Sequence, residues 1–452
     1  MLCTFDFLQD IFPNRQGTKN EDKIIHGIMT DSRQQHDHAL FIPIIGENFD
    51  AHKFIEQAKA KGAIATLWDK QHPVPEELLT EMTFYVVEDT LKALQTLAYA
   101  YRKKVNPFVI GITGSNGKTT TKDMLYAVLK QQYRTHATKG NFNNDIGLPL
   151  TILQMEAETE VLILEMGMND FGEIDLLTKI AEPNYAIITN VGESHIEHLG
   201  SREGIAQAKA EIINGLLDNG LLIRDGDEPL LDSYNNNEHV IRCGYQGTND
   251  VILSEVQIST EGTTFSLNNK ETYTIPLLGK HHALNASYAI TLAKELAMEQ
   301  TLIQSGLNQL EHSSMRFERI IGKNNVTLIN DAYNASPTSM IGAINVVKEL
   351  DEYERRIVVL GDILELGDFS EILHQSVAEV IERPIDVVYT YGDAAKIITT
   401  TIKEKQLDIV ANHFTNRTEL QTRLEKEAEK STIILFKASR GMAFEKLVET
   451  LR

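Results

Sequence analysis

The sequence predicts an α/β protein of three domains, and three observations support this prediction. The chain has 452 residues, which is more than one hydrophobic core usually organises. In its first and last thirds, short apolar runs alternate with segments of helical periodicity, as in parallel sheets covered by helices. In between, a glycine-rich turn separates an apolar run from a helical pattern. We expect a first α/β domain at 1–105, a central P-loop-type domain with a parallel sheet plus short strands at 106–314, and a Rossmann-like α/β domain at 315–452.

The composition is typical of a soluble globular chain and argues against several classes of partner. Hydrophobic residues make up 42% and charged residues 24%, which are ordinary values. A net charge of −21 argues against general binding to nucleic acid or to anionic membranes, so a phosphate site would need a local positive field. Two cysteines, Cys3 and Cys243, make no disulfide framework and suit a reducing compartment. No signal peptide and no apolar run of about 20 residues is visible, so we expect a cytoplasmic protein without a membrane span.

The first domain is predicted from apolar runs separated by helical segments. We expect strands at 24–28, 39–44 and 63–67, helices at 53–61 and 90–104, and a linker at 105–107. Polar turns follow the first two strands, and each contains small residues and a cation. Such turns can bind an anionic ligand, but ordinary solvated loops have the same composition, so both interpretations stay open. The residues concerned are Asp31, Ser32 and Arg33 in the first turn, and Gly46 and Asn48 in the second.

The glycine-rich turn has the pattern of a phosphate-binding loop. Phe108–Ile112 is predicted to be a buried strand, and apolar residues at helical spacing follow Lys118. Between such a strand and helix, backbone N–H groups and the positive end of the helix dipole point at an anion. Lys118 would reach the terminal phosphates, and the Thr119 hydroxyl would meet a magnesium ion. The loop residues are Gly114, Ser115, Asn116, Gly117, Lys118, Thr119 and Thr120.

The loop differs from the common P-loop in one respect. The pattern G-x-x-x-x-G-K-[ST] would place glycine at position 112, whereas this chain has Ile112 there and its glycine at Gly114. The loop is therefore shortened to T-G-x-x-G-K-T. A glycine-rich turn without a ligand is the alternative, but a lysine directed into such a turn is poorly placed unless it neutralises a phosphate. We therefore interpret this stretch as a nucleotide site.

Two further strands of the central domain end in residues suited to metal binding. A strand at 161–164 ends at Glu165, and another at 185–192 is followed by Glu193, Ser194 and His195. A carboxylate at the C-terminal end of a strand beside a phosphate loop lies where a magnesium ligand is needed, although solvated acids are also common there. Lys209 lies in a helix predicted at 201–216, where an exposed lysine is the default interpretation. A loop at 136–147 carries possible hydrogen-bond donors at Lys139, Asn141, Asn143 and Asn144.

The last domain is predicted from alternating strands and helices. After short strands between 220 and 278 and a helix at 280–298, strands at 326–329, 357–360, 387–391 and 432–437 alternate with helices near 338–349, 370–382, 417–430 and 442–451. Polar residues gathered at the C-terminal ends of such strands mark a ligand cleft. The strand ends carry the polar segments 330–337, 361–367 and 437–441.

Taken together, these motifs resemble the Mur ligases, the ATP-dependent amide-forming enzymes of bacterial cell-wall precursor synthesis. The resemblance rests on the loop T-G-S-N-G-K-T-T, on Glu165-Met166-Gly167, and on Thr189-Asn190-Val191-Gly192 with His195. The segments 139–144 and 331–337 are similar to the branch of the family that adds D-alanyl-D-alanine to UDP-N-acetylmuramoyl-tripeptide. The matches run from Met29 to Met442 and so cover essentially the whole chain.

The resemblance implies a two-step reaction. ATP would phosphorylate the terminal carboxylate of the UDP-linked tripeptide, and the amine of D-alanyl-D-alanine would then displace phosphate to form the amide. Because carboxylate and triphosphate repel each other, metal ions and cations would offset their charge. The resemblance assigns Lys118 to the ATP phosphates, Thr119 with Glu165 to one magnesium ion, and Glu165 with His195 to a second. The lysine that matches Lys209 is often carbamylated in this family, which would let it approach the second ion.

The resemblance also implies binding roles in all three domains, together with a monomer whose last domain closes over the central one during turnover. The turns that contain Asp31, Ser32, Arg33, Gly46 and Asn48 would take the uridine nucleotide. ATP would contact the phosphate loop and, in addition, Asn285, Arg316, Asn330, Asp331 and Asn334. Other substrate contacts would come from Lys139, Asn141, Asn143 and Asn144 and, on the dipeptide side, from Asp362, Ser439 and Arg440.

Two other functions stay open. A folylpolyglutamate synthase, a relative with a similar phosphate loop, would share the central and last domains but would lack a uridine-binding first domain. A P-loop NTPase that remodels a protein partner would hydrolyse ATP without a small amine acceptor. A ligase, in contrast, should hydrolyse little ATP until both of its substrates are present.

Overall fold

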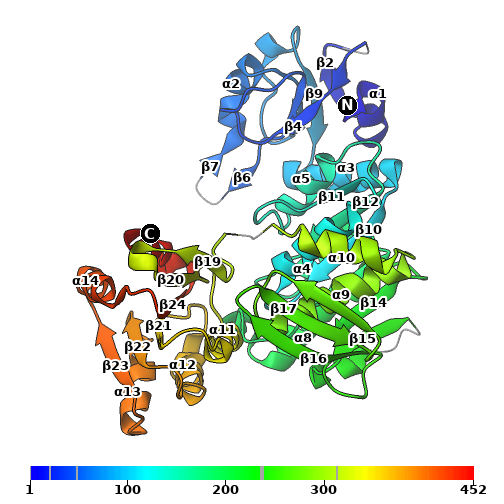
Figure 1. The fold of residues 1–452 in the computed structure, drawn as a ribbon. Helices are drawn as coiled ribbons and strands as arrows, with labels where there is room; N and C mark the ends of the chain where they lie inside the picture. Colours follow the sequence, from blue (N-terminus) through cyan, green and yellow to red (C-terminus); the bar gives the residue numbers. More distant parts are fainter. Residues whose placement is uncertain (1, 20–21, 47–48, 235–238, 312–313) are drawn as a thin grey trace.

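The computed structural model describes residues 2–19, 22–46, 49–234, 239–311 and 314–452. Within these ranges, three main sheets follow one another along the chain, and each is the centre of a unit that we call N-terminal, central or C-terminal (Figure 1). The N-terminal unit lies above the central unit in Figure 1, and the C-terminal unit lies beside the central unit. The predicted α/β architecture is confirmed, because strands and helices alternate in every unit.

The N-terminal unit contains a mixed sheet of short strands. The four strands β4, β5, β8 and β9 run parallel, and β2 pairs with β9 in the antiparallel sense. Small antiparallel pairs, β1 with β3 and β6 with β7, lie apart from this sheet. In sheet order the strands are β2 (Arg15–Gly17), β9 (Thr83–Val87), β8 (Ala63–Asp69), β5 (Ala39–Phe41) and β4 (Gly27–Met29); the small pairs are β1 (Cys3–Thr4), β3 (Ile24–Ile25), β6 (Ile45–Gly46) and β7 (Phe49–Asp50); the helices are α1 (Phe5–Ile11), α2 (Ile55–Ala60) and α3 (Thr90–Val105).

The central unit is built on a long sheet in which the strands from β11 to β16 run parallel, whereas β17 pairs in the antiparallel sense with both β16 and β18. In sheet order they are β11 (Thr135–Ala137), β12 (Val161–Glu165), β10 (Phe108–Thr113), β13 (Tyr185–Ile188), β14 (Leu221–Asp225), β15 (Val240–Gly244), β16 (Val251–Ser259), β17 (Gly262–Leu267) and β18 (Glu271–Ile275). The helices are α4 (Lys118–Leu129), α5 (Gly147–Leu153), α6 (Glu173–Ala181), α7 (Ile196–Leu199), α8 (Arg202–Ala210), α9 (Lys280–Glu295) and α10 (Gln300–Asn308).

Both faces of this central sheet are buried, which explains the continuous apolar runs in its strands. On β10, Val109 belongs to one core cluster, whereas Ile110 and Ile112 belong to the other. The same alternation occurs on β12, where Leu162 and Ile163 point to opposite sides. The chain moves from β10 outward to β11 and β12 and then returns to β13 on the other side of β10. Strand order therefore reverses at β10, and such switch points form ligand crevices at the C-terminal ends of strands.

The C-terminal unit is a parallel sheet with helices on both faces, except that β19 is antiparallel to β20. In sheet order the strands are β19 (Glu318–Ile321), β20 (Thr327–Asn330), β24 (Thr432–Lys437), β21 (Arg355–Gly361), β22 (Val387–Tyr391) and β23 (Val410–Phe414). The helices are α11 (Pro337–Glu349), α12 (Ser370–Glu379), α13 (Lys396–Glu404), α14 (Arg417–Glu427) and α15 (Glu445–Leu451).

Several elements differ from the sequence-based expectation. The predicted helix at 201–216 ends as α8 at Ala210 and continues as a 3-10 segment, Glu211–Gly215. Elements that were not expected include the strands β2, β9, β11, β18, β19 and β23 and the helices α1, α5, α6, α10 and α13. Five of these strands, β2, β11, β18, β19 and β23, lie at the edges of their sheets, where exposed positions carry polar side chains and the apolar signal is weak.

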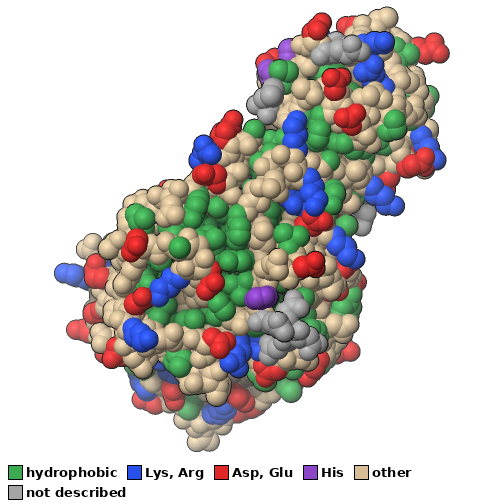
Figure 2. All heavy atoms as spheres, turned by 90° about the vertical axis from the view of Figure 1, so that its right-hand side faces the viewer, with side chains coloured by type: hydrophobic (Ala, Val, Ile, Leu, Met, Phe, Trp, Pro, Cys, Tyr) green, Lys and Arg blue, Asp and Glu red, His purple; other side chains and the backbone are tan. Residues whose placement is uncertain are grey.

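Figure 2 shows the N-terminal unit as a narrower upper lobe and the central unit as a broader body. Acidic and basic side chains are interspersed over this face, so the strong net negative charge does not form one continuous patch in this view. Within the described ranges, no helix is long and apolar enough to cross a membrane.

Candidate active site

A cavity of about 360 Å³ lies at the C-terminal ends of β10, β12 and β13 and is closed on one side by the C-terminal unit. The phosphate loop, the strand-end carboxylate and His195 all line it. From the C-terminal unit, Asp331 and Asn334 reach the same cavity. The structure thus brings together residues that the sequence separates by more than two hundred positions.

The phosphate loop needs its glycines at two close approaches. Gly114 has a φ of +151° and Gly117 a φ of +83°, both in the region that glycine favours. A Cβ atom at Gly114 would lie 1.8 Å from the Thr189 hydroxyl oxygen, and one at Gly117 would lie 2.7 Å from an Asn285 side-chain oxygen. The loop therefore depends on glycine to fit between β13 and α9.

Lys118 begins α4 and lies over this loop. Its ammonium group donates a hydrogen bond to the Gly114 carbonyl oxygen at 2.7 Å. Burial lowers the pKa of Lys118, and the positive charge of Arg316 adds to this effect, while the carboxylate of Glu165 opposes it. A cation that is costly to bury and is directed into a loop of N–H groups fits an anionic phosphate.

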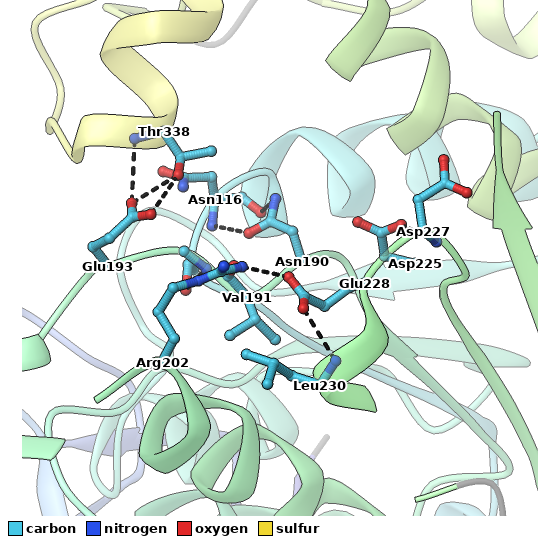
Figure 3. Close-up of polar contacts among 12 residues, drawn as sticks. Asn116, Asn190, Val191, Glu193, Arg202, Asp225, Asp227, Glu228, Leu230 and Thr338 are labelled. Carbon is cyan, nitrogen blue, oxygen red and sulfur yellow. Dashed lines mark hydrogen bonds and ion pairs between the residues drawn. The ribbon is translucent and has the colours of Figure 1, made fainter. Parts of the chain in front are cut away.

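The segment from Thr189 to His195 braces the phosphate loop from the side of β13. The Asn190 side chain accepts a hydrogen bond from the Asn116 backbone N–H at 2.9 Å, as Figure 3 shows. The Ser115 hydroxyl accepts one from the Gly192 N–H, also at 2.9 Å. Arg202, at the start of α8, donates to the Val191 carbonyl oxygen at 2.8 Å and pairs with Glu228 at 2.5 Å. The loop and this strand end therefore form one hydrogen-bonded body.

Glu165 is held at the end of β12 by two donors. The Thr119 hydroxyl donates to its Oε2 atom at 2.9 Å, and the Asn143 amide donates to its Oε1 atom at 2.9 Å. The Glu165 side chain is almost fully buried, and both of these donors to its carboxylate are neutral groups. A buried carboxylate whose hydrogen-bond donors are neutral is suited to a divalent cation, and oxygen ligands are those that Mg²⁺ prefers.

His195 lies at the border between this cavity and a second cavity of about 320 Å³. Its backbone is left-handed, with a φ of +63°. Its Nδ1 atom is 2.7 Å from the Oε2 atom of Glu365, which belongs to the C-terminal unit. Burial lowers the pKa of His195, so its neutral form, which is the form that ligates metals, is favoured.

Lys209 on α8 is buried rather than exposed, with only 2% of its surface accessible. Burial lowers its pKa well below the ordinary lysine value, and the nearby charge of Lys118 adds to this effect. Among the described residues, the charge that acts on Lys209 is that of Lys118, and no carboxylate offsets it. A buried amine with a lowered pKa near two other functional residues is more consistent with a chemical role than with the default surface lysine.

The C-terminal unit also contributes an ion pair and a cation–π contact to the lining of the first cavity. Lys437 lies 2.5 Å from the Asp331 carboxylate, and the Asp331 side chain also accepts the Phe317 N–H at 3.1 Å. The Arg316 guanidinium is 4.0 Å from the centre of the Tyr333 ring. Predicted cofactor residues that line the first cavity are Ser115, Asn116, Gly117, Lys118, Thr119, Thr120, Asn285, Arg316, Asp331 and Asn334.

Some predicted residues are placed elsewhere. Asn330 donates to Glu318 at 3.2 Å and is not among the cavity-lining residues. The Asp362 carboxylate accepts hydrogen bonds from the backbone N–H groups of Asp393 and Ala395, at 3.0 and 2.7 Å. It therefore holds the loop that precedes α13. Lys139 lines a separate cavity beside α4.

The remaining predicted substrate residues divide between the two cavities and the N-terminal unit. Asn143 and Asn144 line the first cavity, and Asn141, Ser439 and Arg440 line the second. In the N-terminal unit, Asp31 forms an ion pair with Arg33, whose hydrogen bonds hold the pKa of Asp31 at about 2. Ser32 donates to Gln57 at 2.9 Å, Gly46 lies in β6, and Asn48 lies outside the described residues. These N-terminal residues line neither of the two cavities.

Sequence reasoning missed residues at the contact between the central and C-terminal units. Glu193 accepts hydrogen bonds from the Thr338 hydroxyl at 2.7 and 2.9 Å and from the Thr338 N–H at 3.2 Å (Figure 3). The Asn116 amide lies 3.1 Å from the Ser336 hydroxyl, which caps α11. Glu193 stands two residues before His195, but its position in a polar strand end does not reveal a partner in another unit.

Comparisons with known proteins agree along the whole chain. Residues 24–102 match the model described as Mur ligase family, catalytic domain, residues 112–293 the Mur ligase middle domain, and residues 315–440 the Mur ligase, glutamate ligase domain. The UDP-N-acetylmuramoyl-tripeptide–D-alanyl-D-alanine ligase of Bacillus subtilis is 48% identical over 95% of this chain and 94% of its own length.

Two solved structures are similar in fold over nearly the full length. The crystal structure of MurF from Acinetobacter baumannii matches with a TM-score of 0.88 and 31% identity, and the match covers 99% of this chain and 98% of that one. MurF ligase from Thermotoga maritima, solved in complex with ADP, matches with a TM-score of 0.82 and 28% identity, and the match covers 94% of this chain and 96% of that one.

Proposed function

This chain belongs to the Mur ligase family, and from that premise we propose that it joins D-alanyl-D-alanine to UDP-N-acetylmuramoyl-tripeptide at the expense of ATP. The observation that carries the proposal is the 48% identity to a ligase of that name, which extends over 95% of the chain and includes the N-terminal unit. A folylpolyglutamate synthase is therefore disfavoured, because it would lack a counterpart of that unit. The product is the pentapeptide precursor of peptidoglycan, and the cytoplasm, where ATP is available, is the proposed place of action.

The proposed reaction begins when the tripeptide carboxylate attacks the γ-phosphorus of ATP. The products of this step are an acyl phosphate and ADP. The dipeptide amine then attacks the acyl carbon, and the tetrahedral intermediate collapses to an amide and inorganic phosphate, while the amine releases a proton. Lys118 and the N–H groups of the phosphate loop would orient the transferred phosphoryl group and offset its charge.

The residues around Glu165 fit a magnesium site. The donor set would be the Thr119 hydroxyl and the Glu165 carboxylate for one ion, and Glu165 with the His195 imidazole for a second. The neutral state of His195 that burial favours is consistent with metal ligation. When bound, Mg²⁺ would supply positive charge that offsets the repulsion between the triphosphate and the substrate carboxylate.

Lys209 is proposed to carry a carbamate. An amine reacts with carbon dioxide only in its uncharged form, and burial of Lys209 favours that form. Labelling with ¹³C-bicarbonate should give a carbamate carbon signal in the NMR spectrum that is absent from Lys209→Ala, whereas Lys446→Ala should retain the signal. A wild-type protein without the signal would contradict the carbamate.

The N-terminal unit is proposed to bind the uridine nucleotide through its polar turns. The exposed Arg33 side chain and the partly buried Asp31 side chain are joined by two hydrogen bonds of 2.8 Å, so they form a polar surface of defined geometry. Since the two solvent-accessible cavities described above receive residues from the central and C-terminal units of one chain, we propose that a monomer is sufficient for activity.

The deciding experiment measures phosphate release from ATP with the tripeptide nucleotide and D-alanyl-D-alanine added singly and together. We expect release only when both are present, with a pentapeptide product identified by mass spectrometry. Tripeptides with lysine and with diaminopimelate should be compared, because both are possible substrates. Release that is indifferent to both substrates would contradict the ligase and favour an NTPase that acts on a protein partner.

A further inference from the structure

The second cavity, of about 320 Å³, lies between the central and C-terminal units and next to the first. His195 lines both cavities, so the second opens directly beside the proposed acyl-transfer site. Its polar lining on the side of the C-terminal unit includes a carboxylate, Glu365, and a guanidinium, Arg440. Opposite charges in one small cavity are suited to a ligand that carries both charges.

Glu365 is held in an unfavourable backbone conformation. Its φ is +64°, a left-handed value that a glycine or an asparagine would adopt at lower cost. The preceding backbone is fixed because the Leu364 N–H donates to the Ser439 hydroxyl at 2.9 Å. The Glu365 side chain is 54% exposed, and its Oε2 atom is 2.7 Å from His195 Nδ1. A strained, anchored turn that nevertheless carries a long carboxylate indicates that the carboxylate is used.

Arg440 provides the positive charge of the cavity. Its nearest carboxylate among the described residues is that of Glu445, at 3.5 Å, which is a loose contact, and its side chain is 54% exposed. Lys437, three residues earlier, is already paired with Asp331 at 2.5 Å. Of the two cations at the C-terminal end of β24, Lys437 and Arg440, it is therefore Arg440 that can bind a further anion.

The cavity also has an apolar wall. The side chains of Ile363, Leu364 and Leu366 line it, and Leu364 is 48% exposed although it is a large hydrophobic residue. Such a wall suits short apolar groups such as methyl side chains. The cavity therefore offers a carboxylate, a guanidinium and an apolar surface, which match the ammonium, carboxylate and methyl groups of a dialanine zwitterion.

We propose that Glu365 receives the amino group of the incoming dipeptide while Arg440 receives its carboxylate. This inference rests on the proposed function and adds the orientation of the second substrate. Glu365 is the member of the pair beside His195, so the amine would point toward the central unit, where the acyl phosphate forms. The carboxylate would point toward the C-terminal unit, away from the triphosphate that would repel it.

The competing role for Glu365 is to orient the imidazole of His195. The two roles affect different steps of the reaction. A residue that positions His195 would influence formation of the acyl phosphate, which needs no dipeptide. A residue that binds the dipeptide amine would influence only the step that follows.

The first test is Glu365→Gln, which preserves size and removes charge. We expect the KM for D-alanyl-D-alanine to rise about 10- to 100-fold, as for loss of a hydrogen bond to a charged group, with KM values for ATP and tripeptide nucleotide changed less than about twofold. Capture of the acyl phosphate by hydroxylamine, a nucleophile that is uncharged at neutral pH, should fall by less than about threefold. Glu365→Asp should give an intermediate KM, and Glu371→Gln, an exposed change on α12, is the matched control.

The second test uses D-alanyl-D-alaninamide, which lacks the dipeptide carboxylate. Wild type and Glu365→Gln should both discriminate against the amide by about tenfold or more, whereas Arg440→Gln should use dipeptide and amide about equally. An unchanged dipeptide KM in Glu365→Gln, or hydroxylamine capture that falls as steeply as amide formation, would overturn the inference. Failure of the proposed function would look different, because the wild-type protein itself would then show no dependence on the dipeptide.

Discussion

The central unit meets its two neighbours in different ways. The joint to the N-terminal unit is made by α3, whose apolar side chains pack against α5 and α6. Leu94, Leu97, Ala98 and Tyr101 on this helix are at least 99% buried and belong to the same core cluster as Leu148 and Ile152 of α5. The Tyr101 hydroxyl donates to the Met155 carbonyl oxygen at 3.0 Å. This joint is therefore a continuous piece of hydrophobic core.

The joint to the C-terminal unit also has an apolar part, since Leu199 of α7 and Leu366 belong to the same core cluster, but beside the cavities it adds several polar contacts. Glu193 accepts hydrogen bonds at the N-terminus of α11, Asn116 meets the Ser336 hydroxyl, and His195 meets Glu365. Each contact includes a residue that lines one of the two cavities. Hydrogen bonds can be exchanged for bonds to water at low net cost, whereas an apolar helix cannot leave its core without exposing it.

From this difference we propose that the C-terminal unit is the one that moves during turnover. The apolar joint should keep the N-terminal unit fixed on the central one, whereas the polar joint allows the C-terminal unit to dock and release. The predicted closure of the C-terminal unit is consistent with this arrangement, and the polar contacts connect docking directly to the phosphate loop through Asn116. The variants described below separate the stability of the apolar joint from the docking at the polar one.

The largest effect on stability is expected at the apolar joint. Tyr101→Ala should lower the free energy of unfolding of the N-terminal unit by about 3–5 kcal/mol, because it leaves a cavity in a packed core. Tyr101→Phe, which removes only the hydrogen bond to Met155, should cost about 1 kcal/mol. The single tryptophan of the chain, Trp68, is buried in this unit, so its fluorescence during urea unfolding reports the change. A loss below about 1 kcal/mol in Tyr101→Ala would mean that α3 is not an integral part of the core.

A different response is expected at the polar joint. Thr338→Val removes the hydroxyl that donates to Glu193 and keeps the side-chain size, so turnover should fall about tenfold while the Trp68 unfolding transition is unchanged. Small-angle scattering with nucleotide and tripeptide substrate should show a larger radius of gyration than for wild type. Thr418→Val is the matched control, because Thr418 occupies the same second helical position in α14 but is exposed. Wild-type turnover and compaction in Thr338→Val would contradict the role of this contact in docking.

The phosphate loop and the strand ends could be predicted because their signals are local. Gly114 and Gly117 are required by backbone conformation, and Glu165 follows directly from an apolar strand. Burial of Lys209 could not be predicted in the same way. This burial depends on how α8 packs against the rest of the central unit. A single lysine in a helical pattern does not indicate which face of the helix is packed.

The dipeptide side of the site shows where local signals fail. Asp362 and Glu365 occupy the same strand-end segment, and sequence reasoning selected Asp362 for the cleft. In the structure Asp362 accepts hydrogen bonds from the loop before α13, and the left-handed turn at Glu365 directs that residue to the cavity instead. The Asn330 side chain likewise donates a hydrogen bond to Glu318 and does not line the first cavity. Which of several polar neighbours faces a site is determined by backbone turns and tertiary partners, not by residue type.

The smallest effect is expected from the ion cluster at the edge of the apolar joint. Burial opposes ionisation of Glu182, but hydrogen bonds from Lys103 and Arg102 outweigh burial and hold its pKa below the ordinary value. Its stabilising contribution is therefore present above the ordinary carboxyl pKa of about 4.5 and is lost as the pH falls through the lower folded-state pKa. Glu182→Gln should lower the free energy of unfolding by about 1 kcal/mol at pH 7, and the difference from wild type should vanish in acid.

Urea unfolding followed by Trp68 fluorescence at pH 7 and in acid measures this effect, with Glu371→Gln, which is exposed in the C-terminal unit, as the control that should match wild type at both pH values. A difference that persists in acid would show that Glu182 acts through packing rather than charge. A difference that vanishes in acid, while the Tyr101→Ala effect persists there, would show that the apolar core of α3 maintains this joint and that the ion cluster only adds to it. The contrast between a joint that stays docked without its charges and one that depends on its hydrogen bonds would then be established by direct measurement.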